Sequence, residues 1–367
     1  MGSKPNVSAK TPYLFRSKPL FGLDIGNGSL KVMQVSHAVS DKSKGRPKLV
    51  GYGTANFDKT AIKDGVIVKP EIIAKAAKEL FERQLIGDIT TRRTAITIPA
   101  YRTFTRSIEL PLLKPKELAE AVNLEAEQYI PLPPEEIYLD YSPLRTHKDG
   151  QDVLAVAVPR TIVDSCLELS QILGLETVLI ETTMSATSRL FSMDKQSDVP
   201  TIIIDFGSLS SDISIYDKAV LTTGTIEGGG EVFTDSIQKA LGVTRAEAAI
   251  IKTKYGLGKS KKQATIQSVL DPILTKIIKE IERLMRYHTE RYGSERPIQQ
   301  IITLGGGANM PGLSEHLTNG LRLAVRTCDP WQYIDFKGLQ PPTTADKPMY
   351  ATAAGLSLVP PEEVFND

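Results

Sequence analysis

The chain has 367 residues, of which 41% are hydrophobic and 24% are charged, with a formal net charge of +1. This length exceeds what one hydrophobic core usually supports and predicts two domains, while the near-zero charge excludes a general electrostatic attraction to nucleic acid or lipid. The two cysteines, Cys166 and Cys328, stand far apart, which favours free thiols in a reducing compartment. No segment reaches the roughly eighteen apolar residues of a membrane-spanning helix, so a cytoplasmic protein is expected.

Residues 1–19 are predicted to form a disordered tail. They contain four basic residues, three prolines and no acidic residue, a composition that cannot build a hydrophobic core. Weak contact of this tail with an anionic membrane surface is an alternative that the sequence leaves open.

A first α/β domain is expected over residues 20–199, because strand-like and helix-like patterns alternate there. Three strands come first, followed by a helix that opens with proline and by a fourth strand, at residues 20–26, 30–38, 48–57, 70–85 and 94–100. A helix at 160–173 and a strand at 176–182 complete the domain.

A small inserted subdomain is expected at about residues 101–159. An alternating strand, a helix with an acidic exposed face, a proline-rich segment and a buried strand at 152–159 follow one another there. The unit interrupts the regular pattern of the first domain, which indicates a separate layer.

The second domain is expected over residues 200–367, because the three-strand opening of the first domain is repeated from Pro200 onward. A helix that ends at Gly242 follows, within a helical insertion at about 229–297. The sequence therefore predicts a duplicated fold.

Two similar turns occupy matching positions in the two halves. LDIGNGSLK at 23–31 and IDFGSLSSD at 204–212 each place an aspartate, a glycine and small polar residues between the first two strands. Glycine allows backbone N–H groups to approach an anion closely, and a carboxylate can hold a hydrated Mg²⁺. Two ordinary hairpin turns are the alternative, since these residue types are common in turns.

We favour phosphate binding because the turns are duplicated at equivalent places, so that they would face one another across a cleft. The candidate phosphate-binding residues are Asp24, Gly26, Asn27, Gly28, Ser29, Lys31, Asp205, Gly207, Ser208 and Ser210. Asp24 and Asp205 are also the candidate Mg²⁺ ligands.

Two further glycine clusters support the same interpretation. EGGGEVF at 227–233 precedes a helix, whose N-terminal N–H groups can bind an anion, and supplies Gly228, Gly229 and Gly230. LGGGANMPGL at 304–313 lies between a strand and a helix and supplies Gly305, Gly306, Gly307 and Asn309, where a flat base could rest against backbone.

The paired turns and the glycine clusters together resemble the actin-like ATPase superfamily. That resemblance implies duplicated RNase H-like domains around a nucleotide cleft, with ATP and Mg²⁺ as ligands. Lys252 matches a lysine that holds the ribose in relatives, although the glutamate that accompanies it there is replaced by Ala249.

Within the superfamily, EAEQYIPLPPEEIYLDYSPL at 125–144 is similar to the inserted subdomain of the PilM family of type IV pilus assembly proteins. The resemblance implies a cytoplasmic scaffold, peripheral on the inner membrane, that grips the cytoplasmic N-terminal tail of a PilN-like membrane protein. Other pilus machinery and self-association are further implied partners, and nucleic acid is not. Tyr129, Ile130 and Leu132 either line the groove for that tail or form a buried corner.

The superfamily pattern is broken where a glutamate followed by proline would position the attacking water. Thr182 and Thr183 occupy those places, and the nearest carboxylate, the candidate catalytic residue Glu181, is one residue early and on the opposite face of a strand. At most a slow ATPase is therefore expected, because phosphoryl transfer depends on positioning.

Two other functions stay open from the sequence. One is an FtsA- or MreB-like filament-forming ATPase, although the chain ends in VPPEEVFND rather than in an amphipathic helix. The other is a small-molecule kinase, for which no convincing catalytic base is present.

Overall fold

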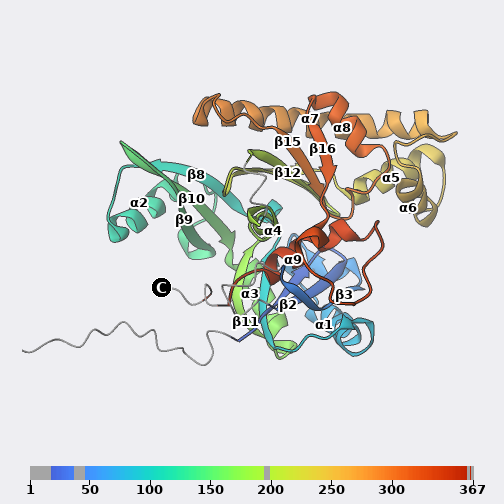
Figure 1. Cartoon of the computed structure of the whole chain (residues 1–367), viewed down its shortest axis with the longest axis horizontal. Helices are drawn as coiled ribbons and strands as arrows, with labels where there is room; N and C mark the ends of the chain where they lie inside the picture. The colour runs from blue at the N-terminus through green and yellow to red at the C-terminus, as the bar shows by residue number, and fades with distance from the viewer. Residues whose placement is uncertain (1–17, 37–45, 194–198, 362–363, 365–367) are drawn as a thin grey trace, which may run out of the picture.

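The computed structural model describes residues 18–36, 46–193, 199–361 and 364 (Figure 1). Nearly all of the predicted tail at 1–19 lies outside the described residues. Figure 1 places one large sheet below and another above, with two helices between them and a small third sheet to the left.

The lower sheet has six strands in the order β11-β7-β1-β2-β3-β6. The first three strands in the sequence are antiparallel neighbours, whereas β7 and β11 join them in parallel. These strands are β1 (Phe21–Ile25), β2 (Ser29–Ser36), β3 (Lys48–Asn56), β6 (Ile86–Gly87), β7 (Arg93–Ile98) and β11 (Glu176–Thr182).

The upper sheet has five strands in the order β14-β13-β12-β15-β16, again with three antiparallel strands followed by parallel ones. Its strands are β12 (Thr201–Phe206), β13 (Ser210–Tyr216), β14 (Val220–Glu227), β15 (Gln300–Leu304) and β16 (Ala324–Thr327). The repeated strand order confirms the duplication that the sequence predicts.

Helices cover both sheets with apolar faces. In the lower half these are α1 (Pro70–Glu79), which begins at proline as predicted, and α3 (Arg160–Ile172). In the upper half, α7 (Gln263–Tyr292) buries Ile266, Leu270, Leu274, Ile277 and Ile281, a spacing of three and four residues that keeps one face on the core. The remaining helices there are α5 (Gly230–Leu241), α6 (Arg245–Lys254) and α8 (Leu313–Leu321).

Local sequence signals set several helix ends. Gly242 adopts a left-handed conformation (φ 62°) and ends α5, as predicted. Thr244 and Glu247 form a capping box that starts α6. The predicted helical stretch at 243–292 is divided into α6 and α7, because Gly256 takes a positive φ of 45° between them.

Two helices lie between the sheets and cross closely. They are α4 (Thr183–Ser192) and α9 (Ala351–Ser357), and a Cβ atom added at Gly355 would lie 1.9 Å from the carbonyl oxygen of Ala186. Only glycine fits at that crossing, so the two halves are in direct backbone contact there.

The small sheet has the order β8-β10-β9 and carries α2 (Pro115–Glu127) on one face. Its strands are β8 (Phe104–Leu110), β9 (Ile137–His147) and β10 (Gly150–Pro159). A two-stranded ribbon of β4 (Ile62–Lys63) and β5 (Val66–Ile67), and a preceding short 3₁₀ helix at Lys59–Ala61, were not predicted. Other short helical turns are Leu80–Gln84, Ala100–Arg102, Pro134–Glu136, Pro330–Tyr333 and Lys347–Tyr350.

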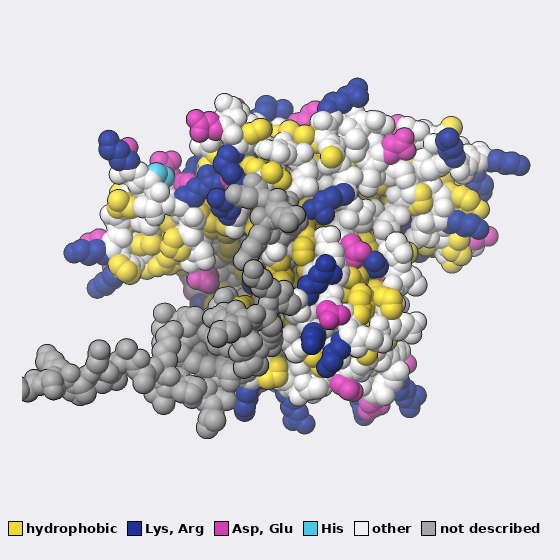
Figure 2. All heavy atoms as spheres, viewed as in Figure 1, with side chains coloured by type: hydrophobic (Ala, Val, Ile, Leu, Met, Phe, Trp, Pro, Cys, Tyr) yellow, Lys and Arg dark blue, Asp and Glu magenta, His cyan; other side chains and the backbone are white. Residues whose placement is uncertain are grey.

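Charged side chains are mixed over the face shown in Figure 2. Lysine and arginine side chains are interspersed with aspartate and glutamate among the described residues of this face, which show no extended field of one sign.

Candidate functional site

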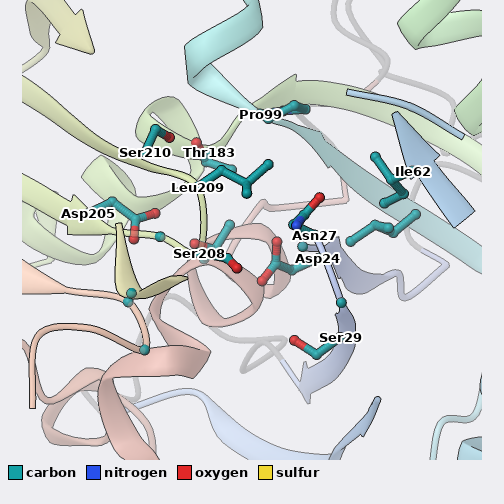
Figure 3. Close-up of a pocket in the computed structure, with 18 of the residues that line it drawn as sticks. Asp24, Asn27, Ser29, Ile62, Pro99, Thr183, Asp205, Ser208, Leu209 and Ser210 are labelled. Atoms are coloured by element: carbon teal, nitrogen blue, oxygen red, sulfur yellow. The ribbon is translucent and has the colours of Figure 1, made fainter. Parts of the chain in front are cut away.

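A cavity of about 390 Å³ lies between the two large sheets. Each sheet contributes its first hairpin turn, so Asp24 and Asn27 face Ser208 and Asp205 across the space (Figure 3). The first turn is tight, since the Gly26 N–H donates to the Ser29 carbonyl at 2.9 Å. The two predicted turns are thus brought together at one cavity.

The acid of the first turn is neutralised by its cross-strand neighbour. Asp24 on β1 is opposite Lys31 on β2, and the Lys31 Nζ donates to Asp24 Oδ2 at 3.1 Å. The Thr97 hydroxyl donates to the other oxygen of Asp24 at 3.2 Å. Lys31 lines the cavity as predicted, but its charge is already shared with Asp24.

The second turn has an acid where the first has a lysine. Asp205 on β12 is opposite Asp212 on β13, at the same sequence separation as Asp24 and Lys31. Burial, together with the charges of Asp212 and Asp24, raises the pKa of Asp205 to about 7. Burial also raises the pKa of Asp212 to about 6, although hydroxyls of Thr225 and Ser210 donate to it.

The carboxylates of Asp205, which is partly buried, and Asp212, which is buried, fit a divalent cation, which would remove the repulsion between them. Among the described residues, no three His, Cys, Asp or Glu side chains are close enough to chelate a metal by themselves. Mg²⁺ suits such a site, because it keeps several waters and takes only one or two carboxylates together with phosphate oxygens.

The glycines at 228–230 act differently from the prediction. The N–H groups of Gly230 and Glu231, at the start of α5, donate to the carbonyls of Gly207 and Ser208 at 2.8 and 2.9 Å. These two N–H groups hold the second turn and are therefore not available to bind an anion. Gly230 lines the cavity, whereas Gly228 and Gly229 do not, and a Cβ atom at Gly229 would lie 2.5 Å from the Gly207 oxygen.

The glycine run at 305–307 lines the cavity beside the second turn. Gly305 has a φ of +81°, and a Cβ atom there would lie 2.2 Å from Asp205 Oδ1, so glycine is required for the backbone to pass the carboxylate. Asn309 lies outside the cavity lining and donates its amide to the Ala345 carbonyl. The predicted base-binding role of Asn309 therefore has no support from its position.

Glu181, the predicted catalytic residue, does not line the cavity. Both of its carboxylate oxygens accept from the Arg189 guanidinium, at 2.7 and 2.9 Å, and one also accepts from Ser185. Arg189 in turn donates to the Gly355 carbonyl at 2.9 Å. The carboxylate thus braces the crossing of α4 and α9, a structural position that corrects the catalytic prediction.

Lys252 lines the cavity as predicted, and its Nζ donates to the Gly230 carbonyl at 2.7 Å and to the Thr234 hydroxyl at 2.9 Å. Burial, followed by the charges of Lys59 and Arg245, lowers the pKa of Lys252. Positive charge is therefore crowded on this side of the cavity.

Sequence reasoning missed several polar residues of the cavity, among them Lys59, Thr97, Thr183 and Asp212. Asp212 could have been found, because it ends the quoted second turn at the position of Lys31 in the first. The other three come from unpredicted connections or neighbouring strands and carry no local motif.

The three predicted partner-binding residues pack mainly inside the small subdomain. Ile130 is 6% exposed and belongs to a cluster with Ala126, Ile137 and Ala157, against which Tyr129 and Leu132 also pack. The Tyr129 ring lies under Arg106 at 4.8 Å and borders a second cavity of about 280 Å³. For Ile130 the buried-corner alternative is the one the structure favours.

Comparison with known proteins begins with the fold. A PilM-PilN type IV pilus biogenesis complex contains a chain with a TM-score of 0.79 at 24% identity, covering 93% of this chain and 98% of that one. The ethanolamine utilization protein EutJ from Carboxydothermus hydrogenoformans has a TM-score of 0.53 at 16% identity, covering 93% and 90%. FtsA cell division proteins are similar in sequence: that of Bacillus subtilis is 23% identical over 91% of this chain and 81% of FtsA, and that of Enterococcus faecalis is 22% identical over 80% and 74%.

Two sheets with matching strand order, two facing aspartate–glycine turns and the central cavity define an actin-like ATPase fold. The sequence profile of the type IV pilus assembly protein PilM matches residues 22–360. The chain belongs to the PilM family of type IV pilus assembly proteins. No helix in the described part of the chain is both long and apolar enough to cross a membrane.

Proposed function

We propose that this protein is a nucleotide-binding scaffold of type IV pilus assembly, with ATP and Mg²⁺ held between the two turns. The observation that carries the proposal is the facing of Asp24 and Asp205 across the cavity, each followed by a glycine turn. The polyphosphate would lie between the turns, and the base would rest near the glycines at 305–307. Asp205 and Asp212 would hold the cation, which would neutralise phosphate charge there when bound.

We also propose that residues 20–199 and 200–367 are two domains that meet at the cavity, with an inserted subdomain at about 101–159 and a helical insertion at about 229–297. Turnover should be slow, because Thr182 and Thr183 replace the water-positioning pair and Glu181 is held by Arg189. The protein would then use ATP mainly to hold a conformation.

Thr183 is the residue for which the cavity predicts a direct ligand contact. Its hydroxyl is shielded from solvent, has no hydrogen-bond partner among the described residues and belongs to a residue that lines the cavity. Thr183→Val should weaken ATP affinity about three- to tenfold, the value of one hydrogen bond, measured by titration with a fluorescent ATP analogue.

Thr187→Val is the matched control, because the Thr187 hydroxyl already donates to the Thr183 carbonyl at 2.7 Å and Thr187 does not line the cavity. It should lower stability without changing affinity. Equal affinities of wild type and Thr183→Val would show that this hydroxyl does not touch the nucleotide.

We further propose that the small sheet docks the cytoplasmic N-terminal tail of a PilN-like membrane protein, which would place this protein at the inner membrane. In the described chain β9 pairs only with β10, so its other edge is free to accept an extended peptide. The Tyr141 N–H donates to Asp140 Oδ1 at 2.8 Å, and Pro143 lacks an N–H, so the usable edge is about 137–140.

The side chains beside this edge favour peptide docking. Tyr138 is 40% exposed, and the Arg160 guanidinium lies 4.1 Å above its ring. The Arg160 Nε is buried and has no hydrogen-bond partner in the described part of the chain. Such a small contact gives modest affinity unless an assembled complex adds avidity.

Tyr138→Ala and Arg160→Ala should each weaken binding of a synthetic PilN-like N-terminal peptide about fivefold or more, because the ring and the guanidinium act as one stacked pair. Fluorescence anisotropy measures the affinity. Tyr255→Ala is the control, since Tyr255 is 39% exposed and lies at the C-cap of the distant α6. Full binding by both Tyr138 and Arg160 variants would move the docking site away from β9.

A further inference from the structure

A charged cluster bridges the two halves at the cavity, and no motif in the sequence points to it. The Lys59 Nζ donates to Glu231 Oε1; Lys59 follows β3 in the lower half, and Glu231 is in the first turn of α5 in the upper half. Arg245 of α6 also contacts Glu231, through its other carboxylate oxygen, and contacts Asp235. The Glu231 carboxylate thus pairs with one basic side chain from each half.

This ion pair lies at the opening of the cavity. The side chains of Lys59 and Glu231 are 49% and 25% exposed, whereas those of Lys31 and Asp24 are 10% and 9% exposed. All four residues line the same space. The buried pair therefore marks the floor and the exposed pair marks the rim.

The stem of Lys59 lies directly over the first turn. A Cβ atom added at Gly28 would be 2.9 Å from Lys59 Cγ, and therefore glycine leaves room for the lysine to cross the turn and reach Glu231. A phosphate seated between the turns would lie beneath this crossing.

We propose that the Lys59–Glu231 pair, held in place by Arg245, is a gate that slows the uptake and release of a nucleoside polyphosphate. This proposal rests on nucleotide binding in the cavity. Because Lys59 and Glu231 come from different halves, opening of the cleft would separate the two side chains and break the pair.

The expected effect is kinetic and salt-dependent. Exposed ion pairs are weak, so loss of the gate should speed nucleotide release about two- to fivefold. Salt screens exposed charges, and raising its concentration should bring wild-type release toward the variant rate.

Stopped-flow release of a fluorescent ATP analogue with Mg²⁺ tests the gate in the full chain. Lys59→Met and Glu231→Gln should each speed release and uptake with little change in affinity, and the double variant should be no faster than either. Lys63→Met on β4 and Glu315→Gln, in the first turn of α8, are matched controls that should release nucleotide at the wild-type rate.

If Lys59 instead binds phosphate, Lys59→Met will weaken binding while Glu231→Gln, which frees the lysine, will strengthen it. That opposite pair of results overturns the gate, as do unchanged release rates in both single variants.

A cross-link separates failure of the gate from failure of nucleotide binding. The Lys59→Cys/Glu231→Cys double variant, treated with a short bis-maleimide, should cross-link without nucleotide and should retain nucleotide bound beforehand. The native thiols should not interfere, because burial raises the pKa of Cys166 and Cys328 to about 12. Release from the cross-linked protein at the normal rate overturns the gate, whereas absence of nucleotide binding by wild type overturns the proposed function itself.

Discussion

Asp205→Asn should abolish most Mg²⁺-dependent ATP binding and at the same time stabilise the ligand-free protein. Affinity should fall at least about tenfold, because the amide cannot neutralise a cation beside the phosphates. The free energy of unfolding should rise by about 1–3 kcal/mol, because a partly buried carboxylate facing Asp212 is removed. Calorimetric titration and chemical denaturation measure the two effects.

Asp217→Asn is the contrasting control, at the residue that follows β13. Asp217 lies outside the cavity lining and accepts from Arg145 and Arg296 at 2.6 and 2.7 Å. Its loss should destabilise the protein while ATP affinity stays the same. If the Asp205→Asn protein binds ATP–Mg²⁺ with the wild-type affinity, the Asp205 carboxylate is not part of the nucleotide site.

Ile130→Asp should unfold the small subdomain. Ile130 is 6% exposed, and its backbone N–H closes the end of α2 on the Ala126 carbonyl at 3.0 Å. A charge placed there without a partner should cost about 3–5 kcal/mol. Hydrogen exchange should show lost protection in β8, β9 and β10, while ATP binding at the remote cavity persists.

Leu124→Asp is the matched control, since Leu124 is on the same helix but is 65% exposed. It should leave hydrogen exchange unchanged. If Ile130→Asp were folded like wild type and had lost only the partner peptide, Ile130 would be a docking residue, as the family resemblance suggested.

The paired turns show which features of the fold could be predicted from local sequence patterns. Their glycines and aspartates, the strands beside them and the helix end at Gly242 were predicted from residues within a few positions of one another. Strand alternation and glycine turns depend on local backbone sterics, which is why these features could be predicted. The duplication then indicated that the two turns share a cavity.

Other predictions failed where a distant partner decided the outcome. Glu181 looks like a free carboxylate in the sequence, but Arg189 and the Gly355 carbonyl, 166 positions from that arginine, fix its role in the helix crossing. The N–H groups at the start of α5 look free for an anion, but the second turn uses two of them. Burial of Ile130 depends on Ile137 and Ala157 from the neighbouring strands.

The sequence by itself determined the succession of strands along each half, the two turns and their acids, because each is encoded by neighbouring residues. Only the tertiary structure decided which charges meet. Lys59 and Glu231 are 172 positions apart and come from different halves, and Asp205 gains its raised pKa only from burial beside Asp212 and Asp24. Electrostatic interactions depend on distance and desolvation in the folded chain, and neither quantity can be derived from a local sequence pattern.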